Sequence, residues 1–315
     1  MPPSQETTDD WPSVVTSTNA HSHGAIFTIN PDGTGERQVT TPRPGVLDAE
    51  PDWSPNGTWI AFERIAAHCC RKPSQRDRLF KVRADGTHLT LLSERLPCGK
   101  EARECPADDY PAWSPSGTRI AFTRDFGPLG PEHGVGLFVM RADGSHVRQI
   151  TQTATPRSFQ DAKPQWSPDG TRLVFDRERL DDGQHAAFTV RLDGTHAHRL
   201  TPWRLSPDDN PDWSPDGRWI LFHSHGDDGK QSKLYLVRPN GTDLHRITHT
   251  HGGTYAWLSS SFSPDGTMIT VSRAPGVGSA GRADVYVMNV DGTDLFDVTS
   301  SASWESQNDW GSERR

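Results

Sequence analysis

The chain has a low share of hydrophobic residues and no excess of positive charge. Hydrophobic residues make up 32% of its 315 residues, and no apolar run approaches the roughly 20 residues of a membrane-spanning helix. Lys and Arg number 33 against 41 Asp and Glu, which gives a net charge of -8 at pH 7, and no basic tract or aromatic RNA-binding motif occurs. These absences argue against a membrane span and against a nucleic-acid partner.

Motifs typical of catalysis and of export are also absent. There is no P-loop, no Gly-x-Ser-x-Gly elbow, no His-Glu-x-x-His and no recognisable Cys/His pair. The N-terminal segment MPPSQETTDDW contains neither the basic nor the apolar part of a signal peptide, which predicts a cytoplasmic protein. The alternative is an exported protein whose signal peptide was replaced by the starting Met.

Cysteine is scarce and confined to two long connections. The four cysteines are Cys69, Cys70, Cys98 and Cys105. Disulfide bonds between these two connections would fit an exported protein, and free thiols would fit a cytoplasmic one. A zinc site is a third alternative, although adjacent Cys-Cys followed by Cys-x6-Cys is poor ligand spacing.

The chain is instead rich in one repeated pattern. An aromatic residue followed by Ser-Pro-x-Gly or a shortened copy recurs at intervals of 47 (Trp166 to Trp213) to 60 residues (Trp53 to Trp113), and its aromatic residues are Trp53, Trp113, Trp166, Trp213, Phe262 and Trp310. Asp-Gly-Thr or a variant alternates with it, beginning at Asp32, Asp85, Asp143, Asp193, Asn240 and Asp291. Repeats of this length indicate an array of small supersecondary units, most simply the blades of a propeller.

Constant spacings place the strands and turns of each unit. The motif aromatic and the marker residue of the next strand are always 9 residues apart, as from Trp53 to Phe62, so the turn between them is tight. Ser-Pro-x-Gly and Asp-Gly-Thr then form the hairpin turns between strands a and b and between strands c and d. Both turns lie on one face, the turn face, and the b–c and d–a connections of variable length form the opposite loop face.

The sequence therefore predicts an all-β fold, a six-bladed β-propeller of four-stranded antiparallel blades in a single domain over residues 1–315. Trp310 supplies strand a of the sixth blade, whose strands b to d come from the N-terminus at Val14–Thr18, Ala25–Asn30 and Glu36–Thr40. Closing the ring with both ends of the chain removes exposed sheet edges. We expect a monomer.

The segment PDWSPDGRWILF, followed by KLYLVRPNGTDLHRIT, within Pro211–Thr248 resembles the repeats of TolB-type six-bladed β-propellers. The resemblance covers essentially the whole chain and implies that fold. It leaves function open, because the superfamily includes the partner-binding TolB protein and also propeller domains of peptidases and lyases.

We expect function on the loop face, where the connections vary. A row of carboxylates lies five residues before the motif aromatic, at Asp48, Asp108, Asp161, Asp208 and Glu305. These carboxylates either ring the mouth of the central channel or each pair with the arginine 16 residues further on, such as Arg64 or Arg124. Repetition in nearly every blade favours the structural pairing.

Histidines and aromatic residues break the symmetry of the repeats on the same face. The His-x-His pairs place two imidazoles on one side of an extended segment, as a divalent metal site requires, and they are His21 and His23, His223 and His225, and His249 and His251. The non-motif aromatics Trp203, Tyr255, Trp257 and Trp304 could stack on a ligand or close the connections over one another.

Two functions remain open from the sequence. The first is a propeller that binds a protein, peptide, glycan or other small-molecule ligand at the channel mouth, through Trp203, Tyr255, Trp257, Trp304, Asp208 and Glu305. The second is a metal-assisted hydrolase, lyase or cyclase on the same face, with a divalent ion on the histidines. We favour binding, because the pattern indicates a surface without a recognisable catalytic set.

Overall fold

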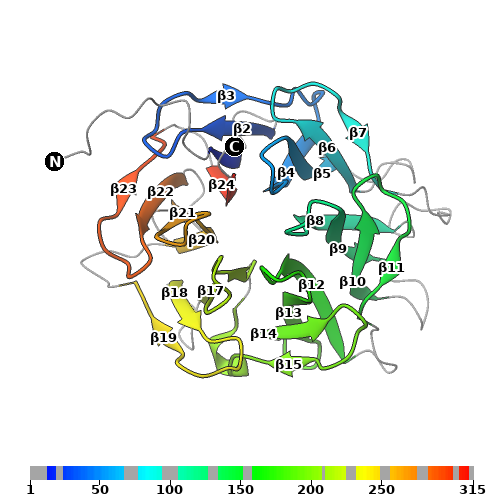
Figure 1. Cartoon of the computed structure of the whole chain (residues 1–315), viewed down its shortest axis with the longest axis vertical. Coiled ribbons are helices and arrows are strands. Elements are labelled where there is room, and N and C mark those ends of the chain that lie inside the picture. Colours follow the sequence, from blue (N-terminus) through cyan, green and yellow to red (C-terminus); the bar gives the residue numbers. More distant parts are fainter. Residues whose placement is uncertain are drawn as a thin grey trace.

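The computed structural model is a ring of six four-stranded antiparallel β-sheets around a central axis (Figure 1). It describes residues 13–18, 24–66, 77–93, 106–126, 134–151, 158–207, 210–224, 232–248, 256–274, 283–300 and 305–311. No helix in these ranges is long and apolar enough to cross a membrane.

Each blade contributes its strands in the order a to d from the axis outward (Figure 1). Blades 1 to 3 consist of β4 (Val46–Trp53), β5 (Trp59–Ala66), β6 (Arg78–Arg83) and β7 (Thr90–Leu91); β8 (Ala107–Trp113), β9 (Arg119–Asp125), β10 (Val135–Arg141) and β11 (Arg148–Gln149); and β12 (Phe159–Trp166), β13 (Arg172–Arg179), β14 (Gln184–Arg191) and β15 (His198–Arg199). Blades 4 and 5 consist of β16 (Asp212–Trp213), β17 (Ile220–Ser224), β18 (Lys233–Val237) and β19 (His245–Arg246); and β20 (Ala256–Phe262), β21 (Met268–Ala274), β22 (Asp284–Asn289) and β23 (Phe296–Asp297). A 3-10 turn, η4 (Trp203–Leu205), follows blade 3.

The sixth blade is built from both ends of the chain, as predicted. Its sheet has the order β24 (Glu305–Trp310), β1 (Val14–Thr18), β2 (Ala25–Ile29) and β3 (Arg37–Gln38). β24 pairs with β1 in antiparallel register, with Val14 opposite Trp310. In Figure 1, β24 (red) lies on the axial side of the blue strand β2. The ring is thus closed by backbone hydrogen bonds between segments almost 300 residues apart in sequence.

The core consists of thin layers between neighbouring blades. Each motif aromatic packs against the preceding blade, as Trp53 and Phe62 of blade 1 do against Val15 and Ile26 of blade 6. Burial of these side chains stabilises each blade interface by roughly 1.5 to 3 kcal/mol per large residue. A modest hydrophobic content is therefore enough, because only the faces between blades need to be apolar.

Side-chain hydrogen bonds explain why the spacings within each blade are constant. The hydroxyl that ends strand d accepts the amide hydrogen of the strand-c residue before the aromatic in all six blades, as Thr151 does from Leu137 at 3.0 Å. In the turn between strands c and d, Gly33 has φ +81°, and a Cβ there would lie 2.7 Å from the carbonyl oxygen of Val298. Only glycine fits such a turn against the neighbouring blade.

Candidate functional site

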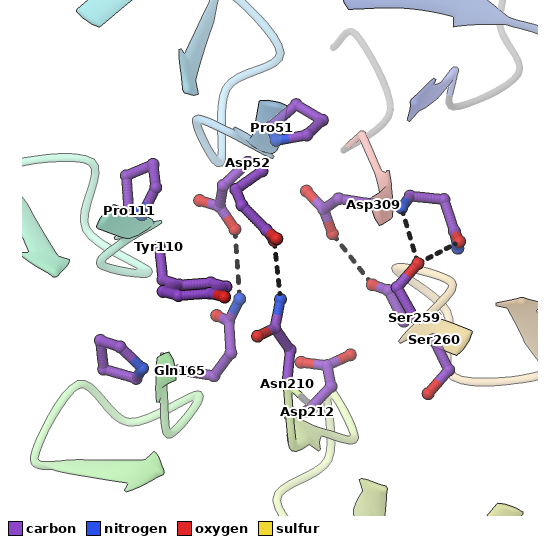
Figure 2. A pocket seen from close by; sticks show the side chains of 14 residues that line it. Pro51, Asp52, Tyr110, Pro111, Gln165, Asn210, Asp212, Ser259, Ser260 and Asp309 are labelled. Carbon is purple, nitrogen blue, oxygen red and sulfur yellow. Dashed lines mark hydrogen bonds between the residues drawn. The ribbon is translucent and has the colours of Figure 1, made fainter. Parts of the chain in front are cut away.

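The inner strands of all six blades converge on a small cavity at the axis (Figure 2). This channel cavity has a volume of about 30 Å³, which is room for about two water molecules, an ion or the tip of a side chain. None of its fourteen lining residues is basic; they are Glu50, Pro51, Asp52, Tyr110, Pro111, Pro164, Gln165, Asn210, Asp212, Ser259, Ser260, Ser261, Asn308 and Asp309.

Three aspartates that line the cavity, the channel carboxylates Asp52, Asp212 and Asp309, connect neighbouring blades. Each directly precedes a motif tryptophan on strand a and accepts a backbone amide hydrogen from the motif aromatic of the next blade. The bonds run from Trp113 N to Asp52 Oδ2 (2.6 Å), from Phe262 N to Asp212 Oδ2 (2.8 Å) and from Trp53 N to Asp309 Oδ2 (2.9 Å). The channel carboxylates therefore hold the ring together and also concentrate negative charge on its axis.

Burial raises the pKa of all three channel carboxylates. The pKa of Asp212 rises to about 7 and that of Asp309 to about 6. The pKa of Asp52 lies well above its usual range, first because of burial and then because of the charge of Asp309. Each added negative charge makes the next one harder to form, so the cavity favours a proton or another cation near neutral pH.

We expect the free energy of unfolding to decrease as pH rises from about 4 to about 7. In this range the folded protein keeps protons on the channel carboxylates that the unfolded chain releases. His185 acts in the same direction, because its hydrogen bond with Asp176 (Nδ1 to Oδ2, 2.7 Å) raises its pKa. Its contribution is complete below the unfolded pKa of about 6.5 and is lost as pH rises through the folded pKa. Thermal unfolding midpoints between about pH 5 and pH 8 test this prediction, and a midpoint that rises across the range would contradict it.

The wall of the cavity is shaped by bulges in strand a. Glu50, Tyr110 and Lys163 occupy the same place in blades 1 to 3 with φ of 48°, 51° and 58°, and the strand register shifts at each of them. Such bulges re-aim side chains. The Tyr110 ring points into the cavity (Figure 2), and Lys163 Nζ lies 5.5 Å from its centroid. Asn210 Nδ2 donates to Glu50 Oε2 at 3.2 Å across the axis, from blade 4 to blade 1.

A second group of carboxylates lies next to Glu50, between blades 1 and 2. Glu63, Asp77 and Asp109 each offer an oxygen, and these oxygens lie within 4.8 Å of one another. The pKa of Glu63 is raised well above its usual range by burial and then by the charges of Asp109, Glu50 and Asp77. Oxygen-only groups of this kind suit hard cations such as Ca²⁺ or Mg²⁺. Glu50 thus lies between the carboxylates of the cavity and this second group.

The predicted carboxylate row forms ion pairs within its own blades wherever both partners are described. Asp48, Asp108 and Asp161 each accept two hydrogen bonds from the arginine 16 residues further on, and the Nε–Oδ1 distance is 2.6 Å in all three. The guanidinium groups also lie over strand aromatics, as Arg124 does over Phe138 at 5.1 Å. Of the two alternatives, the pairing of each carboxylate with its arginine is the one observed in these blades.

Two of the four predicted ligand-binding aromatics are described, and both pack against the blades. Trp203 in η4 stacks on Phe159 with 6.1 Å between ring centroids and lies beneath the guanidinium of Arg179 at 4.8 Å. Trp257 on β20 is half-buried against the core of blades 4 and 5, with Arg273 at 5.5 Å. The structure does not bring these two tryptophans into the lining of the channel cavity.

The remaining predicted residues lie mostly outside the described ranges. His223 is buried on β17, and Glu305 is buried at the start of β24. Outside those ranges lie the predicted binding residues Tyr255, Trp304 and Asp208, the metal candidates His21, His23, His225, His249 and His251, and the cysteines Cys69, Cys70, Cys98 and Cys105. They stay predictions.

The channel carboxylates are functional candidates that the sequence analysis missed. A visible signal existed, because Asp52, Asp212 and Asp309 each directly precede a motif tryptophan. Strand a is the innermost strand, so side chains near its end can converge on the axis. The dyad of Asp176 and His185 was missed too, because nothing in the spacing of β13 and β14 singles it out from the other pairs across these strands.

Comparison with known proteins agrees with this geometry. The profile of the TolB β-propeller domain matches residues 158–278, which span β12 to β21. The fold is that of a TolB-like six-bladed β-propeller. Among solved structures, a TolB candidate from Agrobacterium tumefaciens is 20% identical with a TM-score of 0.68, and the match covers 93% of this chain and 90% of that one.

Other propellers of different function have the same fold. TolB from Acinetobacter baumannii is 17% identical with a TM-score of 0.70, over 97% of this TolB-like chain and 68% of that protein. An oligogalacturonate lyase in complex with manganese is 14% identical with a TM-score of 0.53, over 84% and 71%. No curated protein sequence matches the chain. At these identities the likeness is one of fold, so function must be argued from the site itself.

Proposed function

We propose that the protein is a binding module that holds a ligand on its loop face at the mouth of the channel cavity, and that a cationic group of the ligand enters the cavity. The observation that carries this proposal is the convergence of Asp52, Asp212 and Asp309, with Glu50 above them, in a cavity whose lining contains no basic residue. A cation beside these carboxylates favours their ionised form, so it can compete with protons for the cavity.

The size of the cavity decides what part of a ligand can enter. About 30 Å³ accommodates a metal ion or an ammonium group but excludes a sugar ring or a peptide backbone. The bulk of a larger ligand would therefore rest on the mouth, where Tyr110 and the prolines Pro51, Pro111 and Pro164 supply a rigid and mostly apolar surface. A protein or peptide with a lysine side chain or a free amino terminus has the required chemistry.

Calorimetric titration with two probes, calcium chloride and a lysine-rich hexapeptide, tests the proposal. We expect at least one of them to bind at about pH 7.5, and Glu50→Gln to weaken that binding by roughly tenfold, equivalent to about 1.4 kcal/mol. Glu36→Gln is the matched control, because it removes the same charge at an exposed position outside the cavity. Equal affinity of Glu50→Gln and the unsubstituted protein, or no binding of either probe, would contradict the proposal.

A metal-assisted enzyme is the second candidate. The described feature that favours it is the group of Glu63, Asp77 and Asp109, which could hold a divalent ion beside the cavity mouth. The two candidates differ in what a chelator does to the purified protein. Under the enzyme hypothesis chelation abolishes turnover, whereas a binding module that receives an ammonium group keeps its affinity for the peptide.

A further inference from the structure

A second recess lies away from the channel cavity, between blades 4 and 5 on the turn face. This rim groove has a volume of about 480 Å³, and its apolar part includes Trp219, Leu236 and Val290. Three turn aspartates, Asp216, Asp265 and Asp291, add negative charge, and Arg246 is the only arginine or lysine among its lining residues. The groove therefore combines an aromatic wall with a surplus of carboxylates.

The equivalent place between blades 1 and 2 shows how the fold fills such a position. Lys81, which follows the strand-c aromatic, crosses to the next blade and donates from Nζ to the carbonyl oxygen of Ala142 at 2.6 Å. On its way its Nζ lies 4.8 Å from the ring centroid of Trp59. Between blades 6 and 1, Arg37 comes from strand d and donates to the equivalent carbonyl oxygen, that of Ala84. In two blade interfaces a cationic side chain thus reaches this carbonyl oxygen, from strand c in one and from strand d in the other.

The interface between blades 4 and 5 has the same arrangement but lacks a lysine at the position of Lys81. Trp219 occupies the place of Trp59, because each follows the same turn and donates its backbone amide to the turn serine, Ser214 or Ser54. Val290 takes the place of Ala142 as the residue before the turn aspartate, and its amide makes the same bond to the preceding turn. Leu236 takes the place of Lys81, because each directly follows the strand-c aromatic of its blade.

Of the two charged side chains that lie over Trp59, only one has a counterpart at Trp219. Arg238 lies over Trp219 at 4.0 Å, as Arg83 lies over Trp59 at 5.5 Å. Leu236, however, carries no charge in the place of Lys81. Hydrogen bonds from turn residues hold the pKa values of Asp216 and Asp265 below their usual range, so both are ionised at neutral pH. An incoming cation would meet an aromatic ring, a backbone carbonyl and ionised carboxylates.

We propose that the rim groove binds a lysine or arginine side chain presented by a partner protein. The partner's cation takes the place that Lys81 occupies between blades 1 and 2, against Trp219 and towards the carbonyl oxygen of Val290. This surface is separate from the channel mouth, so it would serve a second contact on the opposite face of the ring.

The test uses two peptides that differ only in charge, acetyl-Ala-Lys-Ala-amide and the same peptide with norleucine in place of lysine. Binding is followed by the indole N–H signal of Trp219 in a two-dimensional NMR spectrum. We expect saturable shifts with the lysine peptide and at least roughly tenfold weaker binding of the norleucine peptide. Equal binding of both peptides, or no shift of the Trp219 signal with either, would overturn the proposal.

Two variants refine the test, and both have precedents within the chain. Leu236→Lys introduces the side chain that blade 1 carries, so it should fill the groove and reduce binding of the lysine peptide at least tenfold, whereas Leu236→Met should not.

Asp265→Asn with Asp291→Asn removes two charges but keeps the turns, because Asn56 and Asn240 form the same hydrogen bonds in other blades. This double variant should weaken binding by roughly tenfold, and unchanged affinity in a folded double variant would also overturn the proposal. Glu50→Gln, in the channel mouth, should leave this binding unchanged.

Discussion

Removal of the last inner strand is expected to abolish cooperative folding of the whole ring. Deletion of Asn308–Arg315 removes the segment of β24 that contributes Trp310 to the core of blades 5 and 6, and Asp309, which accepts the amide hydrogen of Trp53. It also removes the pairing of Val14 with Trp310 and of Val15 with Asp309, half of the register that joins β24 to β1. Because each blade is stabilised by its neighbours, loss of one interface on each side of blade 6 opens the ring. A thermal melt followed by circular dichroism should show no sharp transition.

Single substitutions of Trp310 test the contribution of its side chain to ring closure without shortening the chain. Trp310→Ala should cost about 3 to 5 kcal/mol, as large-to-small changes in a core do. Trp310→Phe should cost much less, because blade 5 carries Phe262 at the equivalent position. A deletion variant that melts as cooperatively as the full chain would show that the ring is held together in another way.

The second large effect concerns the buried ion pair of blade 2. Arg124→Met should destabilise the protein by about 3 to 5 kcal/mol, because it leaves Asp108 buried without its counter-charge. The side chains of Arg124 and Asp108 are only 4% and 5% exposed. The matched change Arg64→Met should cost less, since Arg64 is 22% exposed and water can reach its site.

The double variant Asp108→Leu with Arg124→Met tests the physical cause. Replacing both charges by apolar groups of similar size removes the uncompensated carboxylate, so most of the stability should return. Urea unfolding of the single and double variants at about pH 7 measures both effects. A double variant as unstable as Arg124→Met alone would indicate that packing of the guanidinium, rather than charge, dominates at this position.

The propeller and its closure could be predicted because they depend on local chemistry that repeats. The Ser-Pro-x-Gly turns, the Asp-Gly-Thr turns and the hydroxyl at the end of strand d impose constant spacings, which are visible without coordinates. The offset of 16 residues between Asp48 and Arg64 likewise reflects direct pairing across strands a and b. Such contacts lie within one blade, so their register can be read along the chain.

The channel cavity could not be predicted in the same way, because it depends on all six blades at once. Asp52, Asp212 and Asp309 come from three blades, and their proximity follows from how the ring closes. Their raised pKa values follow from burial, which the order of residues does not show. The rim groove depends on a comparison between blades, since Leu236 is informative only beside Lys81 and its contact with Ala142.

Proton release on ligand binding is the most direct measure of whether the channel carboxylates form the binding site. Calorimetric titration of whichever probe binds, calcium chloride or the lysine-rich hexapeptide, is repeated in buffers of different ionisation enthalpy at about pH 6.5 and about pH 8.5. Because the pKa values of Asp212 and Asp309 are about 7 and about 6, an entering cation should displace more protons at the lower pH than at the higher pH. Binding that releases no protons at about pH 6.5 would contradict a cation site in the channel cavity.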